Sequence, residues 1–134
     1  MIADIDISRQ LGADGVVFGC LTSKGDIDKD INARLMEHAK GMSITFHRAF
    51  DVCTDPHQAI EDLIQLGFDR ILTSGQQPKA IQGVQELAAL QRQADKRIQI
   101  MAGCGVNEEN ITKIYSSTQI NEYHFSAREK ILPD

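Results

Sequence analysis

The sequence contains no tryptophan, and aromatic residues make up only 5% of its 134 residues. Basic residues are also few: Lys and Arg number 14 against 19 Asp and Glu, which gives a net charge of -5. This shortage argues against nucleic acid as the main partner, because phosphate backbones are bound by clustered positive charge. No apolar run approaches the ~18 residues of a membrane span, and residues 1–6 lack the features of a secretory signal. We therefore expect neither a nucleic-acid nor a membrane partner.

Cysteine is scarce as well, with three residues and no CxxC spacing. A sparse, odd number of thiols is typical of a reducing compartment and not of a disulfide framework. The dinucleotide-binding pattern GxGxxG is absent too. The chain length is that of one domain. These observations predict a single acidic domain in the cytoplasm.

Short runs rich in β-branched and aromatic residues alternate with longer amphipathic runs. Five of them are typical of strands buried on both faces: 15–21, 43–47, 70–73, 98–101 and 122–125. Their starts recur at nearly equal intervals, with helical patterns between them. Repeating βα units predict a parallel α/β sheet with right-handed crossovers. Both an open doubly wound sheet and part of a (β/α)8 barrel fit this pattern.

Local signals define several of the helices. Asp28 is a plausible N-cap, and Asp55 followed by Pro56 is a second helix start. Gly67 supplies a left-handed stop for the helix that Asp55 begins. Further helices are expected over 81–90 and 107–115, and residues 2–11 give a weaker helical pattern.

Polar residues follow each predicted strand, whereas the strand starts carry little chemistry. In parallel α/β sheets the reactive groups lie at the carboxyl ends of the strands. The residues at these ends, strand by strand, are Cys20 and Thr22; His47, Arg48 and Asp51; Thr73, Ser74 and Gly75; Gly103, Cys104 and Gly105; and His124, Ser126 and Arg128. The sequence therefore predicts one shared polar mouth at this edge of the sheet.

The densest cluster of these residues follows the second strand. His47 could act as an acid or base or bind a metal, with Asp51 fixing its tautomer, and Arg48 could hold an oxyanion. His124 would be a second acid or base. Alternatively, Arg48 and Asp51 form a structural pair that closes the loop, and His47 is merely hydrogen-bonded.

Two further sets of residues carry open alternatives. The Gly103-Cys104-Gly105 turn could seat a phosphate at a helix N-terminus, or it could be only a tight turn. Cys20 and Cys104, together with His47 and His124, have side chains suited to Cu(I) or Zn. The thiols could equally be buried apolar fillers.

Six ordered blocks together resemble the copper homeostasis protein CutC family. They are Gly12-Ala13-Asp14-Gly15-Val16-Val17-Phe18-Gly19; Leu21-Thr22 with Gly25 and Ile27-Asp28; Thr45-Phe46-His47-Arg48-Ala49-Phe50-Asp51; Leu66-Gly67-Phe68 with Arg70-Ile71-Leu72-Thr73-Ser74-Gly75; Ala102-Gly103-Cys104-Gly105-Val106; and Glu122-Tyr123-His124-Phe125-Ser126-Ala127-Arg128. The resemblance implies a TIM-type barrel in which these strands correspond to the fourth to eighth. Residues 1–134 would then be one partial domain without the first three strands and the C-terminal segment.

Three functions remain open on this basis. The first is cytosolic copper handling, with Cu(I) bound by Cys20, His47, Cys104 and His124. The second is a TIM-barrel enzyme, or a degenerate relative, that acts on a small anionic metabolite. Its ligand-binding residues would be Ser74, Gly75, Gly103, Gly105, Ser126 and Arg128, and its catalytic residues His47, His124, Arg48 and Asp51. The third is a structural module without chemistry. Because five strands cannot close a barrel, we also expect self-association through the open edges.

Overall fold

Five short parallel strands form one sheet, in the order in which they follow one another along the chain. The computed structural model describes residues 2–12 and 14–125. The strands are β1 (Gly15–Phe18), β2 (Ser43–Phe46), β3 (Arg70–Thr73), β4 (Gln99–Ala102) and β5 (Glu122–Tyr123). Each adjacent pair is parallel, as the repeating βα pattern predicts.

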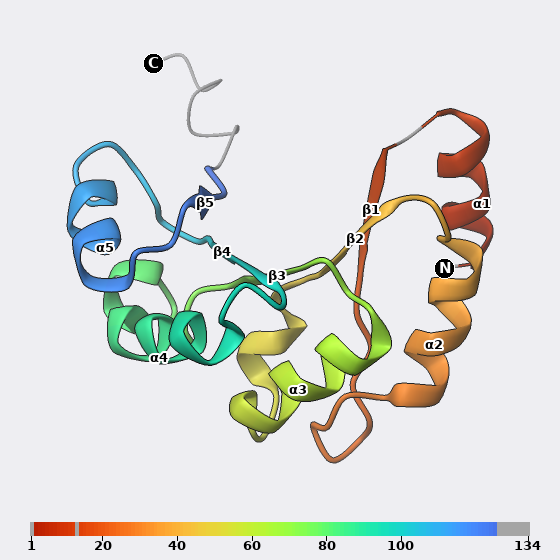
Figure 1. Ribbon diagram of the computed structural model, residues 1–134, viewed down its shortest axis with the longest axis horizontal. Coiled ribbons are helices and arrows are strands. Elements are labelled where there is room, and N and C mark those ends of the chain that lie inside the picture. Colours follow the sequence, from red (N-terminus) through yellow and green to blue (C-terminus); the bar gives the residue numbers. More distant parts are fainter. Residues whose placement is uncertain (1, 13, 126–134) are drawn as a thin grey trace.

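The sheet bends into an arc, and the α-helices line its convex side (Figure 1). They are α1 (Ile2–Gln10), α2 (Lys29–His38), α3 (Pro56–Leu66), α4 (Val84–Ala94) and α5 (Ile111–Thr118), with two short 3-10 helices, η1 (Arg48–Val52) and η2 (Ala80–Gly83). None of the helices within 2–12 and 14–125 is both long and apolar enough to cross a membrane.

The strand order decides between the two architectures that the sequence left open. A doubly wound sheet reverses its strand order at a switch point and carries helices on both faces. Here the order is β1-β2-β3-β4-β5, without a reversal. Right-handed crossovers that all run in one direction place every helix on the same face. The prediction of a partial barrel is therefore confirmed, and the doubly wound alternative is wrong.

The hydrophobic core lies between the sheet and the helices. Phe46 is fully buried on β2, and its ring contacts Phe68 edge-on, with the centroids 5.4 Å apart. The ring of Phe18 on β1 also packs against the ring of Phe68, with the centroids 5.5 Å apart. Ile71 and Ile100, both fully buried, continue this layer on β3 and β4. Alternate residues of each strand therefore face the helices, and the residues between them face the concave side.

The helix boundaries follow the local signals in the sequence. The Asp55 carboxylate accepts hydrogen bonds from the backbone N–H groups of His57 and Gln58, and Pro56 opens α3. Gly67 closes the same helix at φ 98°, a left-handed conformation that favours glycine. Asp28 caps α2 by accepting from the N–H of Ile31. These predicted caps are confirmed.

Other boundaries differ from the predictions. The expected helix over 107–115 begins later, at Ile111, because the Asn107 side chain accepts from the N–H groups of Glu109 and Asn110 and forms a turn. The prediction that each strand is buried on both faces is also wrong for β1, where Phe18 is 3% exposed but Val17 is 60% exposed. The helices cover only one side of this strand, so its other side lies open.

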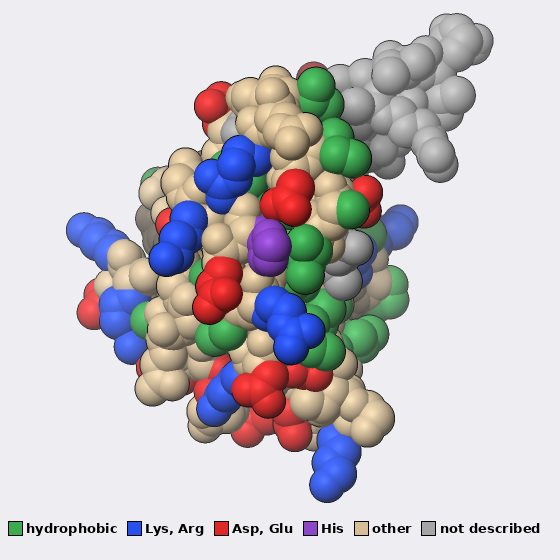
Figure 2. All heavy atoms as spheres, turned by 90° about the vertical axis from the view of Figure 1, so that its right-hand side faces the viewer, with side chains coloured by type: hydrophobic (Ala, Val, Ile, Leu, Met, Phe, Trp, Pro, Cys, Tyr) green, Lys and Arg blue, Asp and Glu red, His purple; other side chains and the backbone are tan. Residues whose placement is uncertain are grey.

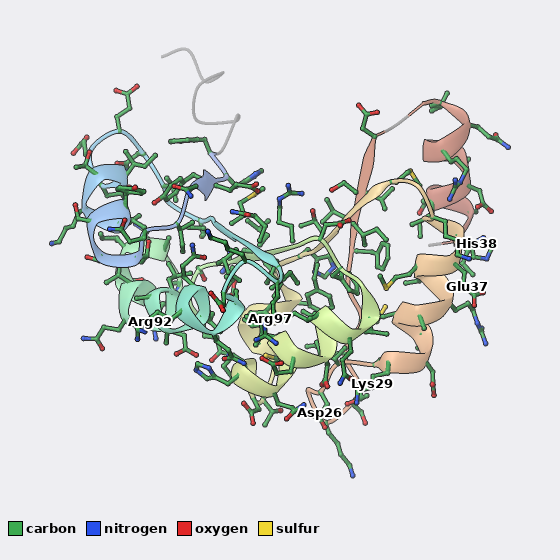
Figure 3. All side chains as sticks on the ribbon, in the orientation of Figure 1. Asp26, Lys29, Glu37, His38, Arg92 and Arg97 are labelled. Atoms are coloured by element: carbon green, nitrogen blue, oxygen red, sulfur yellow. The ribbon has the colours of Figure 1, made fainter. Side chains whose placement is uncertain are left out.

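A polar seam joins α3 to α4 on the outer side of the arc, where Figure 3 shows Arg92 and Arg97. His57 Nδ1 lies 2.6 Å from Gln93 Oε1, and its Nε2 lies 3.3 Å from a Glu86 carboxylate oxygen. Because both ring nitrogens face acceptors, the hydrogen bond to Gln93 raises the pKa of His57, and the Glu86 charge adds to this against the effect of burial. Hydrogen bonds from Arg97 and Gln93 lower the pKa of Glu61 to about 2.

This seam predicts a pH dependence of stability. A pKa that folding raises above its ordinary value of 6.5 contributes stability that is full below that value and is lost as the pH rises through the folded-state pKa. Between about pH 6 and pH 8 we therefore expect the urea midpoint of the wild type to fall more than that of His57→Asn. Glu86→Gln, which removes only the charge, should give an intermediate fall. Equal falls in wild type and His57→Asn would contradict this assignment.

Candidate functional site at the carboxyl ends of the strands

Asp51 anchors the carboxyl ends of β2 and β3. It lies on η1, directly after β2, and its side chain is only 6% exposed. One carboxylate oxygen accepts from Thr73 Oγ1 at 2.5 Å and from the N–H groups of Ser74 and Gln76 at 3.1 and 3.2 Å. The other accepts from Arg48 Nε and from Ser74 Oγ. Because both oxygens are engaged, these contacts favour a structural role for Asp51 over a catalytic one.

Arg48 connects the ends of β2 and β3. Its Nη2 donates to Ser74 Oγ at 3.0 Å, and its Nε donates to Asp51. Burial lowers the pKa of Arg48, but the hydrogen bond and charge of Asp51 and the nearby Cys104 raise it by more. The guanidinium therefore bridges the ends of β2 and β3. Its side chain is 39% exposed, so part of this charge faces solvent.

His47 caps η1, and this capping fixes its tautomer. Its Nδ1 accepts from the backbone N–H of Ala49 at 3.0 Å, so the neutral ring carries its proton on Nε2. Within the described residues this Nε2 has no hydrogen-bond partner. Asp51 was expected to set the tautomer, but its oxygens accept from Arg48 and from residues at the end of β3, and the Ala49 N–H sets the tautomer instead. His47 therefore presents a hydrogen-bond donor at the mouth.

The glycine-rich turn brings the ends of β4 and β5 together. A Cβ at Gly103 would lie 2.6 Å from Leu72 Cδ1, the end of a flexible side chain, and 3.4 Å from the Cβ of His124, so a larger residue here would displace Leu72. His124 is exposed, and its N–H donates to the carbonyl of Ala102 at 2.9 Å. Gly103 and His124 are thus direct neighbours, as expected for residues at adjacent strand ends.

The turn at Gly103–Gly105 lacks the helix N-terminus that was expected to bind a phosphate there. Helix α5 begins at Ile111, after an intervening turn, so its N-terminus does not directly follow the glycines. The side chain of Lys79 instead packs beside Gly105, with Lys79 Cγ 3.3 Å from the place of a Cβ there. The sequence analysis missed Lys79, whose only signal was its place in the loop after β3. Ser126 and Arg128 lie outside the described residues.

The three cysteines are free and differ in their surroundings. Burial, with the charge of Asp51, raises the pKa of Cys53 to about 11. Burial and the charge of Asp28 also raise the pKa of Cys20. Cys104 is half-exposed, and its thiol donates to the carbonyl of Pro78 at 2.9 Å. A thiol binds a soft metal as the thiolate, so Cys53 is poorly suited as a ligand.

The structure does not bring the four expected metal ligands together. Cys20 lies beyond β1, where its backbone is held by the Asn32 side chain, whereas His124 follows β5. Three strands separate these two ends of the arc. Among the described residues no group of three or more His, Cys, Asp and Glu side chains is placed to hold a metal ion. Of the four, Cys20 and His47 follow one pair of neighbouring strands, β1 and β2, and Cys104 and His124 follow another, β4 and β5.

Charged residues at two strand starts were missed. Arg70 Nε on β3 donates to the carboxylate of Glu122 on β5, and its Nη1 lies 3.2 Å from Ser43 Oγ and 3.4 Å from Thr45 Oγ1. These residues form a polar layer on the concave face that spans β2 to β5. In the sequence these polar residues alternate with the buried residues Ile44 and Ile71, and this alternation could have predicted a polar face.

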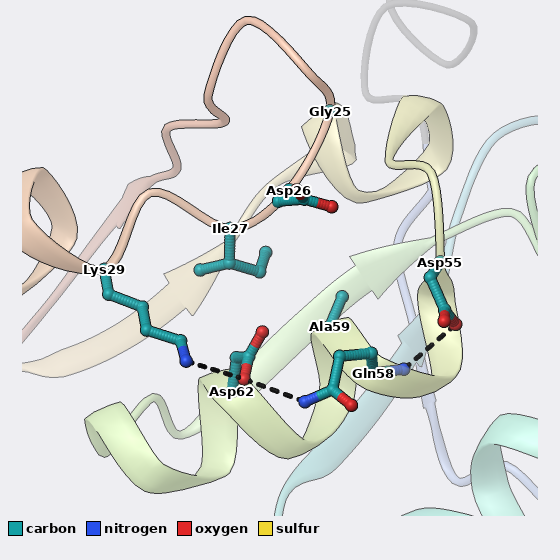
Figure 4. A pocket seen from close by; sticks show the side chains of 8 residues that line it. All are labelled: Gly25, Asp26, Ile27, Lys29, Asp55, Gln58, Ala59 and Asp62. Atoms are coloured by element: carbon teal, nitrogen blue, oxygen red, sulfur yellow. Dashed lines mark hydrogen bonds and ion pairs between the residues drawn. The ribbon is translucent and has the colours of Figure 1, made fainter.

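A cavity of about 340 Å³ lies between the β1–α2 loop and α3 (Figure 4). Asp62, 7% exposed, accepts from Gln58 Nε2 at 3.1 Å and lies 3.4 Å from Lys29 Nζ. Asp55 lines the same space while it caps α3. Asp62 thus joins α3 to the start of α2, and Asp55 caps α3, so both carboxylates have roles within the fold.

Comparison with known proteins gives one consistent result. The model of the CutC family matches residues 1–129. A CutC family protein of Bacteroides thetaiotaomicron is 59% identical over 134 residues, which are 100% of this chain and 54% of the relative. A CutC family protein of Porphyromonas gingivalis is 50% identical over 131 residues, covering 98% of this chain and 53% of the relative. The chain thus spans about half the length of these curated relatives.

A solved structure agrees with these sequence matches. The crystal structure of a CutC protein from Streptococcus agalactiae, assigned by its name to copper homeostasis, superposes with a TM-score of 0.87 at 35% identity. The match covers 92% of this chain and 60% of the streptococcal chain. Because the family model covers nearly the whole sequence, this chain belongs to the CutC family.

Proposed function

We propose that this protein takes part in copper homeostasis, the role in the name of the streptococcal relative, and that it binds Cu(I) in the reducing cytosol. The observation that carries the proposal is Cys104, a free and half-exposed thiol at the carboxyl end of β4. Thiolate and imidazole are soft ligands suited to Cu(I). Because the chain spans about half of its relatives, the proposal concerns the ligands that this half supplies.

The favoured ligands are Cys104 and His124, which belong to neighbouring strand ends. The raised pKa of Cys20 makes its thiolate harder to form, so Cys20 is the weaker ligand. His47 is less suited than His124. Metal binding through its Nε2 would move the proton to Nδ1, and Nδ1 could then no longer accept from Ala49.

An anaerobic titration with Cu(I) against a chromogenic chelator tests this proposal. Cys104→Ala should weaken Cu(I) binding about tenfold or more, which corresponds to at least ~1.4 kcal/mol. Cys53→Ala is the matched control and should bind like the wild type, because its buried thiol has a pKa of about 11. Equal affinity of wild type and Cys104→Ala would remove Cys104 from the ligand set. A wild type that does not compete with the chelator would overturn the proposal.

A small anionic ligand, such as a phosphorylated metabolite, is the second candidate. It is favoured by the Nε2–H of His47 and the partly exposed guanidinium of Arg48, which come from consecutive residues at one strand end. An imidazole that donates a proton and an arginine that clamps an oxyanion suit acid–base chemistry on such a ligand. In a parallel titration with inorganic phosphate, binding that Arg48→Gln abolishes and Cys104→Ala retains would favour this candidate over copper.

A further inference from the structure

The cavity between the β1–α2 loop and α3 is lined by carboxylates from two elements (Figure 4). Asp26 comes from the loop, whereas Asp55 and Asp62 come from the N-cap and the middle of α3. Lys29 is the one basic side chain among the described residues that line the cavity. Figure 2 shows acidic side chains gathered at the lower end of the α1–α2 face, at the height of this loop. With three carboxylates against one ammonium group, the cavity carries an excess of two negative charges.

Asp62 is a largely buried carboxylate with one oxygen left for a ligand. Its side chain is only 10% exposed, and its Oδ1 receives both of its contacts, from Lys29 and Gln58. In Figure 4 the other oxygen points toward Ile27, into the cavity. No donor within the described part of the chain reaches this second oxygen. Because a carboxylate removed from water needs partners, the free oxygen favours a ligand that carries positive charge or donates a hydrogen bond.

The rest of the lining adds further free carboxylate oxygens and an apolar wall. Asp55 caps α3 through Oδ1 alone. Neither its second oxygen nor the carboxylate of Asp26 has a hydrogen-bond or ion-pair partner among the residues that the structure describes. Ile27 and Ala59, each 4% exposed, supply the apolar part of the lining. The cavity therefore combines separate negative groups with a surface that alkyl carbons can contact.

The ammonium group of Lys29 shows which chemistry Asp62 accepts. Its Nζ lies 3.4 Å from Asp62 Oδ1, and its side chain is 59% exposed. Exposed ion pairs are weak, so another ammonium group can displace this one. The described carboxylates are not grouped closely enough to hold a metal ion. These observations together favour an organic cation whose charges are spread over the cavity.

We propose that this cavity binds a small aliphatic diamine. One ammonium group replaces that of Lys29 at Asp62, the second pairs with Asp26, and the methylene groups contact Ile27 and Ala59. Two ammonium groups balance the excess of two negative charges, and a volume of about 340 Å³ is within the usual range for a small-molecule site. The lining includes none of the expected copper ligands, so this proposal is independent of the copper proposal.

Isothermal titration calorimetry of the full chain with 1,4-diaminobutane tests this proposal. Asp62→Asn keeps the shape of the side chain but removes its charge, so it should weaken binding about tenfold or more. Lys29→Met removes the internal competitor and should tighten binding about threefold, because the site is then free in a larger fraction of the molecules. Asp30→Asn and Lys24→Met are the matched controls. They make the same changes of charge at exposed residues outside the lining and should bind like the wild type.

Asp26→Asn keeps the test readable if Asp62→Asn does not fold, since Asp26 is exposed on the loop, and it should weaken binding about threefold. A wild type that releases no heat of binding would overturn the proposal. Equal affinities of the wild type and both Asp variants would also overturn it. The same holds if 1,4-butanediol, which has a similar shape without charge, binds as tightly as the diamine. Displacement of the diamine by an equal concentration of Mg²⁺ would identify a simple cation site in its place.

Discussion

Asp51→Ala is expected to lower the free energy of unfolding by about 4 kcal/mol, because it removes one partner of a buried ion pair and leaves several donors unsatisfied. The carboxylate, whose side chain is 6% exposed, accepts hydrogen bonds from the Thr73 hydroxyl and from the Gln76 N–H. It also accepts from the backbone N–H and the hydroxyl of Ser74. Alanine provides no acceptor for any of them. Arg48 would also lose the carboxylate that holds its guanidinium against Ser74.

Urea denaturation followed by circular dichroism measures this loss. Asp51→Asn keeps the shape and one acceptor oxygen, so its loss should lie between those of wild type and Asp51→Ala. If Asp51→Ala does not fold, the urea denaturation of Asp51→Asn still measures the loss of stability. Asp26→Ala is the matched control, since Asp26 is exposed on the β1–α2 loop, and its midpoint should stay near that of the wild type. An Asp51→Ala midpoint equal to that of Asp26→Ala would disprove the anchoring role.

Gly83→Ala is expected to cost about 3 kcal/mol, as overpacking against a rigid neighbour does. A Cβ at Gly83 would fall on the backbone oxygen of Ser74, closer than real Cβ atoms come, and 3.0 Å from the Cα of Gly75. Backbone atoms cannot rotate away as a flexible side chain can. Displacement of Ser74 would also disturb its contacts with Arg48 and Asp51.

Gly41→Ala separates this clash from the cost of backbone conformation. Gly41 has φ +87°, and the nearest atom to a Cβ there is 4.0 Å away, in the Arg9 side chain. Its substitution should cost about 1 kcal/mol, from the left-handed conformation alone. If calorimetry or urea unfolding gave Gly83→Ala a loss no larger than that of Gly41→Ala, the close approach to Ser74 would not be rigid.

Local signals made much of the fold predictable. The Asp55-Pro56 start and the Gly67 stop of α3 depend on neighbouring residues only, and the structure has both. The choice between barrel and doubly wound sheet was not predictable from these signals, because both architectures use the same βα units. That choice lies in the order of the strands. The short helix η1 was also missed, since its cap uses the ring of His47, a residue with no strong capping signal.

Some contacts at the carboxyl ends of the strands could be predicted from the sequence, whereas the roles of the individual residues could not. Because carboxyl ends of parallel strands share one edge, the sequence placed Arg48 and Ser74 together, and the structure joins them by a hydrogen bond. The structural pairing of Asp51 with Arg48 was one of the two alternatives that the sequence offered. Its anchoring of the end of β3 could not be predicted, since those donors come from the next βα unit along the chain. Arg70 and Glu122 escaped notice because their pairing crosses β4, which no local pattern encodes.

The sequential order of the strands has a consequence for biosynthesis. Within residues 2–12 and 14–125 each strand pairs only with the strands before and after it in the chain, so every βα unit finds its partner a short stretch away. Chain closure over such short separations has a small entropic cost, and folds rich in near-neighbour contacts form quickly. A nascent chain leaving the ribosome can therefore add one unit at a time to a sheet that has already formed.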